Sequence, residues 1–250
     1  MLFYRKYKPI IVFYLLACLF SWPFFFWRDA RTDSWESLGL HYVIKTSLVM
    51  WGPGIAAIIC WFLFSGRVKR SVSLLGTSVL LSLIFWGFPF LLLVMAGLED
   101  KNHQIHHIIP VQVLLGSFIY TLGEELGWRG YLQDQLGHLP RWKRYLLIGT
   151  LWEIWHFTTR TLSGPFIGRV LRPLLFILPM SVLSFLYGES VSKSRSVVIA
   201  VTLHTWVNLA IEYPQARTFV VLGISIPFWF LMIWKWDRIR AWPVFLRSQN

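Results

Sequence analysis

The stretch Gly123-Glu124-Glu125-Leu126-Gly127-Trp128-Arg129-Gly130-Tyr131-Leu132 places two acids and an arginine at the end of a long apolar run. An ionisable side chain near the centre of a bilayer costs about 2.5–3.5 kcal/mol or more. Such side chains cannot face lipid, so the helix that carries them must turn them toward the interior of a protein. The stretch therefore predicts a bundle of membrane helices with a polar site inside it.

The composition supports this prediction. Hydrophobic residues make up 56% of the 250 residues and charged residues 14%, with a mean hydropathy of +0.54. A soluble domain has about 25% charged residues. The 15 Trp and 9 Tyr suit aromatic belts at the two membrane interfaces. No linker, low-complexity tract or internal repeat divides the sequence, so we expect an all-α, polytopic integral membrane protein with a single membrane domain, 1–250.

Eight apolar runs are long enough to be transmembrane helices, since a spanning helix needs about 20 mostly apolar residues. They lie at roughly 9–27, 43–64, 73–97, 107–127, 143–160, 171–188, 196–212 and 216–235. The first run lacks a small-residue cleavage site at its end, so we expect it to be retained as a span. The fourth, fifth and seventh runs carry polar residues and score weakest, and such weak spans are where function tends to lie.

The net charge of +12 is spread over short loops between the apolar runs. This distribution argues against a nucleic-acid partner and is typical of a membrane protein oriented in the lipid bilayer by its positive loops. It predicts that both termini are cytoplasmic. One loop, around residues 160–172, disagrees, because Arg160, Arg169 and Arg172 would lie outside; it is either re-entrant or bounded by misplaced spans. Cys18 and Cys60 lie in apolar runs and are expected to act as small hydrophobic residues.

Three of the weak spans bring a polar residue to a similar depth. Glu124, His156 and His204 lie 9 to 13 residues from loops on the predicted cytoplasmic side. At a rise of 1.5 Å per residue, this distance is on the order of 14–20 Å for each. We therefore expect the three side chains to meet near the middle of the membrane.

The first motif contains acids with two different environments. Glu125 and Arg129 are four residues apart on a helix and can form a structural ion pair. Glu124 points about 100° away and is the candidate general base. The alternative is a buried salt bridge that only fixes helix positions. Gly123 and Gly127 form a small-xxx-small pair that lets another helix approach closely.

Two further motifs lie on the fifth and seventh runs. A lone histidine such as His156 is usually a hydrogen-bonded core residue. However, His204 and Asn208 share one helix face and can aim two hydrogen-bond donors at one point, as an oxyanion site requires. Glu153 is a supporting residue that either orients His156 or pairs with Arg160.

These motifs occur in the order EExxxR, aromatic-x-x-x-His and HxxxN, on separate predicted helices. This pattern resembles the CPBP family, the CAAX-protease and bacteriocin-processing intramembrane endopeptidases, also called the ABI family, which includes type II CAAX prenyl endopeptidases. The resemblance covers about residues 107–210, including EELGWRGYLQDQL and GTLWEIWHF. Two positions depart from the pattern: Trp152 stands where Phe is common, and a Pro after the histidine is missing. Neither departure is expected to touch a reacting group.

The resemblance implies an intramembrane endopeptidase, a hydrolase that cleaves a membrane-associated peptide near the cytoplasmic face. It implies that Glu124 and His156 activate a water, while His204 and Asn208 stabilise the oxyanion. Substrates left open are a prenylated CAAX tail, a bacteriocin leader and a membrane-bound signalling peptide. The compact chain and its GWRGYL motif resemble bacterial proteins, which implies a multi-pass protein of the plasma membrane.

The sequence lacks the HExxH motif of many zinc proteases. We therefore favour a glutamate-activated water and no cofactor, although Glu124, His156 and His204 can also compose a zinc site. Two other classes of function stay open. One is a transporter or proton relay, because intramembrane acids and histidines mark ion pathways. The other is a catalytically silent scaffold or immunity protein.

Overall fold

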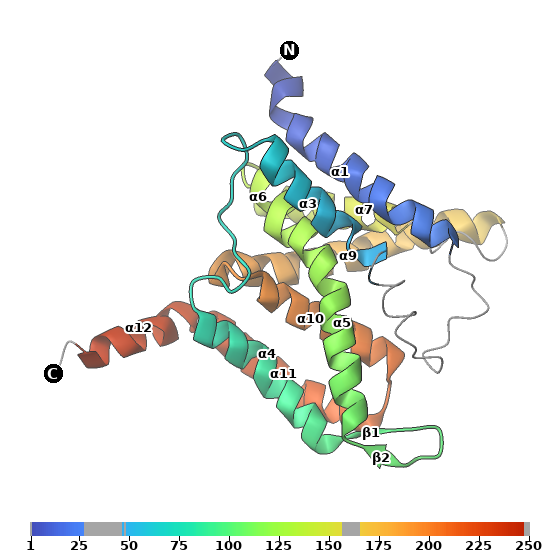
Figure 1. Cartoon of the computed structure of the whole chain (residues 1–250), viewed down its shortest axis with the longest axis vertical. Coiled ribbons are helices and arrows are strands. Elements are labelled where there is room, and N and C mark those ends of the chain that lie inside the picture. The colour runs from blue at the N-terminus through green and yellow to red at the C-terminus, as the bar shows by residue number, and fades with distance from the viewer. Residues whose placement is uncertain (1, 28–46, 48, 157–165, 248–250) are drawn as a thin grey trace. The chain divides into compact units, whose positions relative to one another are not determined.

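The computed structural model describes residues 2–27, 47, 49–156 and 166–247, and Figure 1 shows that most of them are helical. Its contacts divide the chain into two compact units, each made of two separate parts of the sequence. The first unit comprises Met1–Val72 and Ile119–Glu189, and the second comprises Ser73–Phe118 and Ser190–Asn250. Helices α5 and α9 run from one unit into the other. The single domain over 1–250 stays a prediction.

The first unit holds the N-terminal helices and the helices that carry the first two motifs. Its elements are α1 (Leu2–Trp27), α3 (Gly52–Leu63), the second part of α5 (Ile108–Gly127), the π-helical turn η2 (Trp128–Leu132), α6 (Gln133–Gln135), α7 (Arg141–Trp155) and most of α9 (Phe166–Ser194).

The second unit holds the C-terminal helices and a short hairpin. Its elements are α4 (Val79–Ala96), β1 (Leu98–Glu99), β2 (Ile105–His106), the first part of α5, α10 (Val197–Glu212), α11 (Ala216–Trp234) and α12 (Trp236–Arg247). The two strands pair antiparallel, with Leu98 opposite His106 and Glu99 opposite Ile105.

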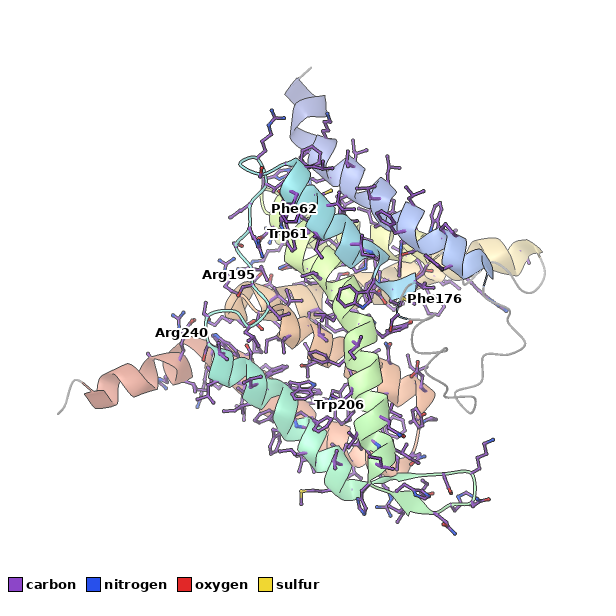
Figure 2. The ribbon with its side chains drawn as sticks, viewed as in Figure 1. Trp61, Phe62, Phe176, Arg195, Trp206 and Arg240 are labelled. Atoms are coloured by element: carbon purple, nitrogen blue, oxygen red, sulfur yellow. The ribbon has the colours of Figure 1, made fainter. Side chains whose placement is uncertain are left out.

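Small residues let α1 and α3 lie side by side in the first unit (Figure 1). Ala17 and Ala56 are fully buried. A Cβ added to Gly52 would lie 2.0 Å from the Oγ atom of Ser21, which itself donates a hydrogen bond of 2.7 Å to the carbonyl of Val49. A larger residue at position 52 would force these closely packed helices apart. Farther along α3, the side chains of Trp61 and Phe62 are labelled in Figure 2, and Phe62 is 78% exposed.

Aromatic side chains of α4, α10 and α11 form the core of the second unit. Trp206, labelled in Figure 2, packs edge-on against Trp229 with ring centroids 5.8 Å apart. The indole N–H of Trp229 donates to the carbonyl of Phe85 at 3.0 Å. Before α10, Arg195 adopts a positive φ of 60°, and its carbonyl accepts a 2.9 Å hydrogen bond from the N–H of Ser73. The core therefore joins segments that lie far apart in the sequence.

Four helices in the described part of the chain are long and apolar enough to cross a membrane. The qualifying segments are Tyr7–Phe24, Val79–Ala96, Leu171–Ser194 and Ala216–Trp234. Helices α3 and α10 are apolar but shorter. These findings confirm an all-α, polytopic membrane protein, while the count of eight spans stays a prediction. Helices α5, α7 and α10, the three predicted weak spans, are not among the four.

One predicted boundary is wrong. The loop expected around 160–172 is helical from Phe166 onward, so Arg169 and Arg172 lie within α9. Arginine is a good helix former, and its charge does not end a helix. Within the second predicted span, 43–64, helix α3 begins at Gly52, where Pro53 suits the first helical turn, and the described residues 47, 49 and 50 are also helical, so the start of this span stays a prediction. Arg160 lies outside the described residues, and so does its pairing with Glu153. The orientation of the chain stays a prediction.

Candidate active site

The first motif lies where α5 ends and the π-helical turn η2 begins. Such wide turns inside helices are frequent at functional sites. Helix α3 packs against this segment at two glycines. A Cβ added to Gly123 would lie 2.7 Å from the Cα atom of Trp51, and one added to Gly127 would lie 2.4 Å from the Cβ atom of Pro53. The close approach predicted from Gly123 and Gly127 is therefore confirmed.

The predicted ion pair between Glu125 and Arg129 is also confirmed. The Nη1 atom of Arg129 lies 2.8 Å from Oε2 and 2.9 Å from Oε1 of Glu125, and both side chains are 0% exposed. The Nη2 atom of Arg129 donates to the Oγ atom of Ser184 at 3.2 Å. The guanidinium carbon lies 4.4 Å from the ring centroid of Trp152 and 5.1 Å from that of Tyr187. A carboxylate, a hydroxyl and two aromatic faces thus offset the cost of burying this cation.

The carboxylate of Glu124 is held by a different helix. Glu124 is 1% exposed, and its Oε2 atom accepts a hydrogen bond of 2.7 Å from the indole N–H of Trp152 on α7. The expectation that the departure at position 152 touches no presumed reacting group is therefore wrong. A phenylalanine at this position has no donor, whereas tryptophan has one. The sequence alone cannot show that this donor reaches an acid on another helix.

His156 is the C-terminal cap of α7 and is half-buried. Its Nδ1 atom lies 3.0 Å from the carbonyl oxygen of Trp152, which also accepts the backbone N–H of His156 at 3.1 Å. A carbonyl oxygen only accepts hydrogen bonds, so Nδ1 carries a proton and donates to it. The ring rests edge-on against Trp155, with centroids 4.7 Å apart. Trp152 therefore contacts both Glu124 and His156.

The other predicted site residues have less direct support. Glu153 is 1% exposed on α7, and its support of His156 stays a prediction. His204 is 6% exposed and Asn208 is half-buried, both on α10 of the second unit. Their joint action with Glu124 stays a prediction. Within the described ranges, no three His, Cys, Asp or Glu side chains are grouped as metal ligands, and a zinc site remains the alternative.

Sequence reasoning missed two residues of α9 that surround Arg129. Ser184 is 0% exposed and Tyr187 is 2% exposed. Both belong to an apolar helix in which neither is unusual by itself. The sequence feature that could have pointed to them is their spacing of three residues, which places both side chains on the same helix face.

Comparisons with known proteins agree with the motifs. Residues 106–210 match the family described as type II CAAX prenyl endopeptidase Rce1-like. A "CAAX prenyl protease 2" from Methanococcus maripaludis is 29% identical over 110 residues, which covers 40% of this chain. The chain spans only 39% of the length of that curated relative. The family match includes all three motifs and agrees with the predicted range of 107–210. Through residues 106–210, the chain is therefore similar to the type II CAAX prenyl endopeptidases of the Rce1-like family.

Proposed function

We propose that this protein is a membrane endopeptidase that hydrolyses a peptide bond in a membrane-associated peptide. The Rce1-like match and the name of the archaeal relative support this class of reaction. The observation that carries the proposal is the position of the buried carboxylate of Glu124, which accepts a hydrogen bond from the indole N–H of Trp152. The backbone carbonyl of the same Trp152 accepts a hydrogen bond from His156. An acid and a histidine held by one residue suit the activation of a water.

In the proposed mechanism, Glu124 takes a proton from a water that His156 helps to hold, and the resulting hydroxide attacks the carbonyl carbon of the scissile bond. In its neutral form, His156 can accept a hydrogen bond from that water through Nε2, because Nδ1 donates to the carbonyl of Trp152. His204 and Asn208 stabilise the negative oxygen of the tetrahedral intermediate. The carbon–nitrogen bond then breaks, and the proton passes to the leaving amine.

The proposed substrate is a peptide with a CAAX terminus whose cysteine is prenylated. The name of the relative supports this class, and a prenyl chain would hold the peptide at the membrane because burying each CH₂ contributes about 0.8 kcal/mol. We place cleavage near the cytoplasmic face of a bacterial plasma membrane, with both termini in the cytoplasm.

The test uses the full chain in liposomes and two fluorogenic CAAX peptides, one farnesylated and one unmodified. Glu124→Gln keeps an oxygen that can accept from Trp152, so the protein should fold, but it removes the base. We expect kcat to fall by about 10²–10⁴-fold. Glu99→Gln makes the same chemical change in the hairpin and should leave kcat unchanged. Activity of Glu124→Gln within a few-fold of wild type would exclude Glu124 as the base. Equal cleavage of both peptides would exclude recognition of the prenyl group.

Two further measurements separate the competing proposals. A strong chelator should leave the activity unchanged if Glu124 and His156 act without a metal. One zinc per chain, lost and restored together with activity, would instead make Glu124, His156 and His204 candidate ligands around a zinc-bound water. Ion flux in the same liposomes without cleavage of either peptide would support a transporter or proton relay.

A further inference from the structure

We propose that Trp152 is a positioning residue that sets the orientation of the Glu124 carboxylate through its indole N–H. This inference rests on the proposed function, because it concerns the step in which Glu124 takes a proton from water. The aromatic-x-x-x-His pattern requires only an aromatic ring at position 152, so the role of its N–H as a hydrogen-bond donor is an addition.

The geometry leaves the indole little freedom. Trp152 is 1% exposed, and its ring lies against the guanidinium of Arg129 at 4.4 Å. Arg129 is itself held by both carboxylate oxygens of Glu125. Rotation of the indole away from Glu124 would break its contact with a buried cation. The ion pair therefore supports the ring, and the ring in turn holds the carboxylate.

Trp152 also links the two groups proposed to activate the water. Its side chain donates to Glu124 at 2.7 Å, while its carbonyl accepts from Nδ1 of His156 at 3.0 Å. A general base must lie within about 2.6–3.2 Å of the proton that it removes, and small misplacements are costly. Since one residue contacts both groups, it fixes how the carboxylate and the imidazole are presented to a shared water.

The competing explanation is that the indole only satisfies a buried acid and contributes to stability. The two explanations differ in what is lost when the N–H is removed. A positioning role lowers kcat and leaves KM unchanged, because the interaction matters in the transition state. A purely structural role lowers the melting temperature and leaves kcat of the folded protein unchanged.

The experiment replaces Trp152 in two ways and measures cleavage of the farnesylated peptide in liposomes. Trp152→Phe keeps an aromatic ring without the donor. Incorporation of β-(3-benzothienyl)alanine at position 152 keeps the bicyclic shape and replaces N–H by sulfur. We expect both changes to lower kcat by about 10- to 100-fold, the loss of one hydrogen bond to a charged group, with KM unchanged. Trp229→Phe is the matched control, because it removes a buried indole donor that bonds to the carbonyl of Phe85.

The decisive comparison repeats Trp152→Phe in the Glu124→Gln background. If Trp152 acts through Glu124, the second change should cause no further loss of the residual rate. An equal loss in both backgrounds, or an unchanged kcat in the wild-type background, would overturn the positioning role while proteolysis stands. A wild-type protein that cleaves neither peptide would overturn the proposed function and the positioning role together.

Discussion

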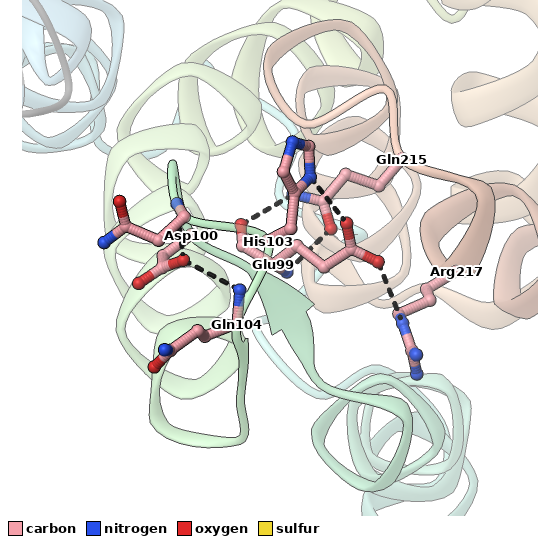
Figure 3. Close-up of polar contacts among 7 residues, drawn as sticks. Glu99, Asp100, His103, Gln104, Gln215 and Arg217 are labelled. Carbon is pink, nitrogen blue, oxygen red and sulfur yellow. Dashed lines mark hydrogen bonds and ion pairs between the residues drawn. The ribbon is translucent and has the colours of Figure 1, made fainter.

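Two of the acid–arginine pairs among the described residues lie in opposite surroundings. Glu125 and Arg129 lie 2.8 Å apart with both side chains 0% exposed. In the second unit, the Nε atom of Arg217 lies 3.5 Å from Oε1 of Glu99, and each side chain is 37% exposed (Figure 3). Comparing these two pairs shows the same ion pair without and with access to water.

The exposed pair is one of several contacts that hold the start of the hairpin against the start of α11 (Figure 3). The side-chain amide of Gln215 exchanges two hydrogen bonds with the backbone of Glu99, at 2.9 and 2.8 Å. His103 lies 3.5 Å from the other carboxylate oxygen of Glu99, and Arg217 also donates to the carbonyl of Ala96 at 2.7 Å. Bulk water can reach the exposed pair, whereas the Arg129 side chain is 0% exposed, and its carboxylate, hydroxyl and aromatic contacts offset its desolvation. We conclude that burial, more than distance, decides how much each pair matters.

The largest effect is expected for Arg129→Ala. Removing one partner of a buried pair leaves an uncompensated charge and should lower the free energy of unfolding by about 3–5 kcal/mol. Unfolding in detergent, followed by temperature or denaturant, measures this loss. Glu124→Gln is the reference variant and should be less destabilising. Equal melting temperatures for the two variants would contradict the structural role of the buried pair.

A smaller effect is expected for Gly127→Ala, which tests how tightly the helices around the buried pair are packed. The new methyl group would lie 2.4 Å from the Cβ atom of Pro53 and 2.7 Å from its backbone. Such overpacking typically costs about 1–3 kcal/mol. Gly116→Ala on the same helix is the control, because a Cβ there meets nothing within 4 Å. It should stabilise the helix by about 0.5–1 kcal/mol. Equal unfolding free energies for the two variants would show that the contact with α3 can relax.

A still smaller effect is expected for Arg217→Ala in the hairpin. Exposed ion pairs contribute about 0–1 kcal/mol and are screened by salt. The variant should therefore unfold close to wild type, and the difference should shrink between low and high salt. A loss of unfolding free energy as large as that of Arg129→Ala would contradict the conclusion that burial decides how much each pair contributes.

The smallest effect concerns the pH dependence of the hairpin. The hydrogen bond from the backbone N–H of Gln104 holds the pKa of Asp100 below its usual value; desolvation opposes this, and the backbone N–H of Asn102 and a contact from His106 add to the lowering. A lowered pKa in the folded state means that ionised Asp100 adds stability above the ordinary aspartate pKa of about 3.9. This contribution is lost as the pH falls through the lowered value. Asp100→Asn should remove that acid dependence, measured as amide hydrogen exchange in the hairpin. An unchanged acid dependence would assign it to other groups.

Much of the candidate site could be predicted because it depends on one helix at a time. The pairing of Glu125 with Arg129 follows from the helical repeat, since residues four apart are neighbours on any helix. The glycines Gly123 and Gly127 indicate a close approach because only small residues permit one. The order of the motifs indicated a resemblance to the CAAX proteases, and the match over residues 106–210 agrees with it. The catalytic roles of His204 and Asn208 stay predictions.

The sequence by itself determined that this is a helical membrane protein with a buried acid–arginine pair, because hydropathy and helical spacing are local properties. Only the tertiary structure showed that Trp152 donates to Glu124 and that Ser184 on α9 supports Arg129. It also showed that α9 begins at Phe166, within a segment whose arginines suggested a loop. The physical reason is that a contact between helices depends on how each is rotated and packed against the other, and no spacing within a single helix contains that information.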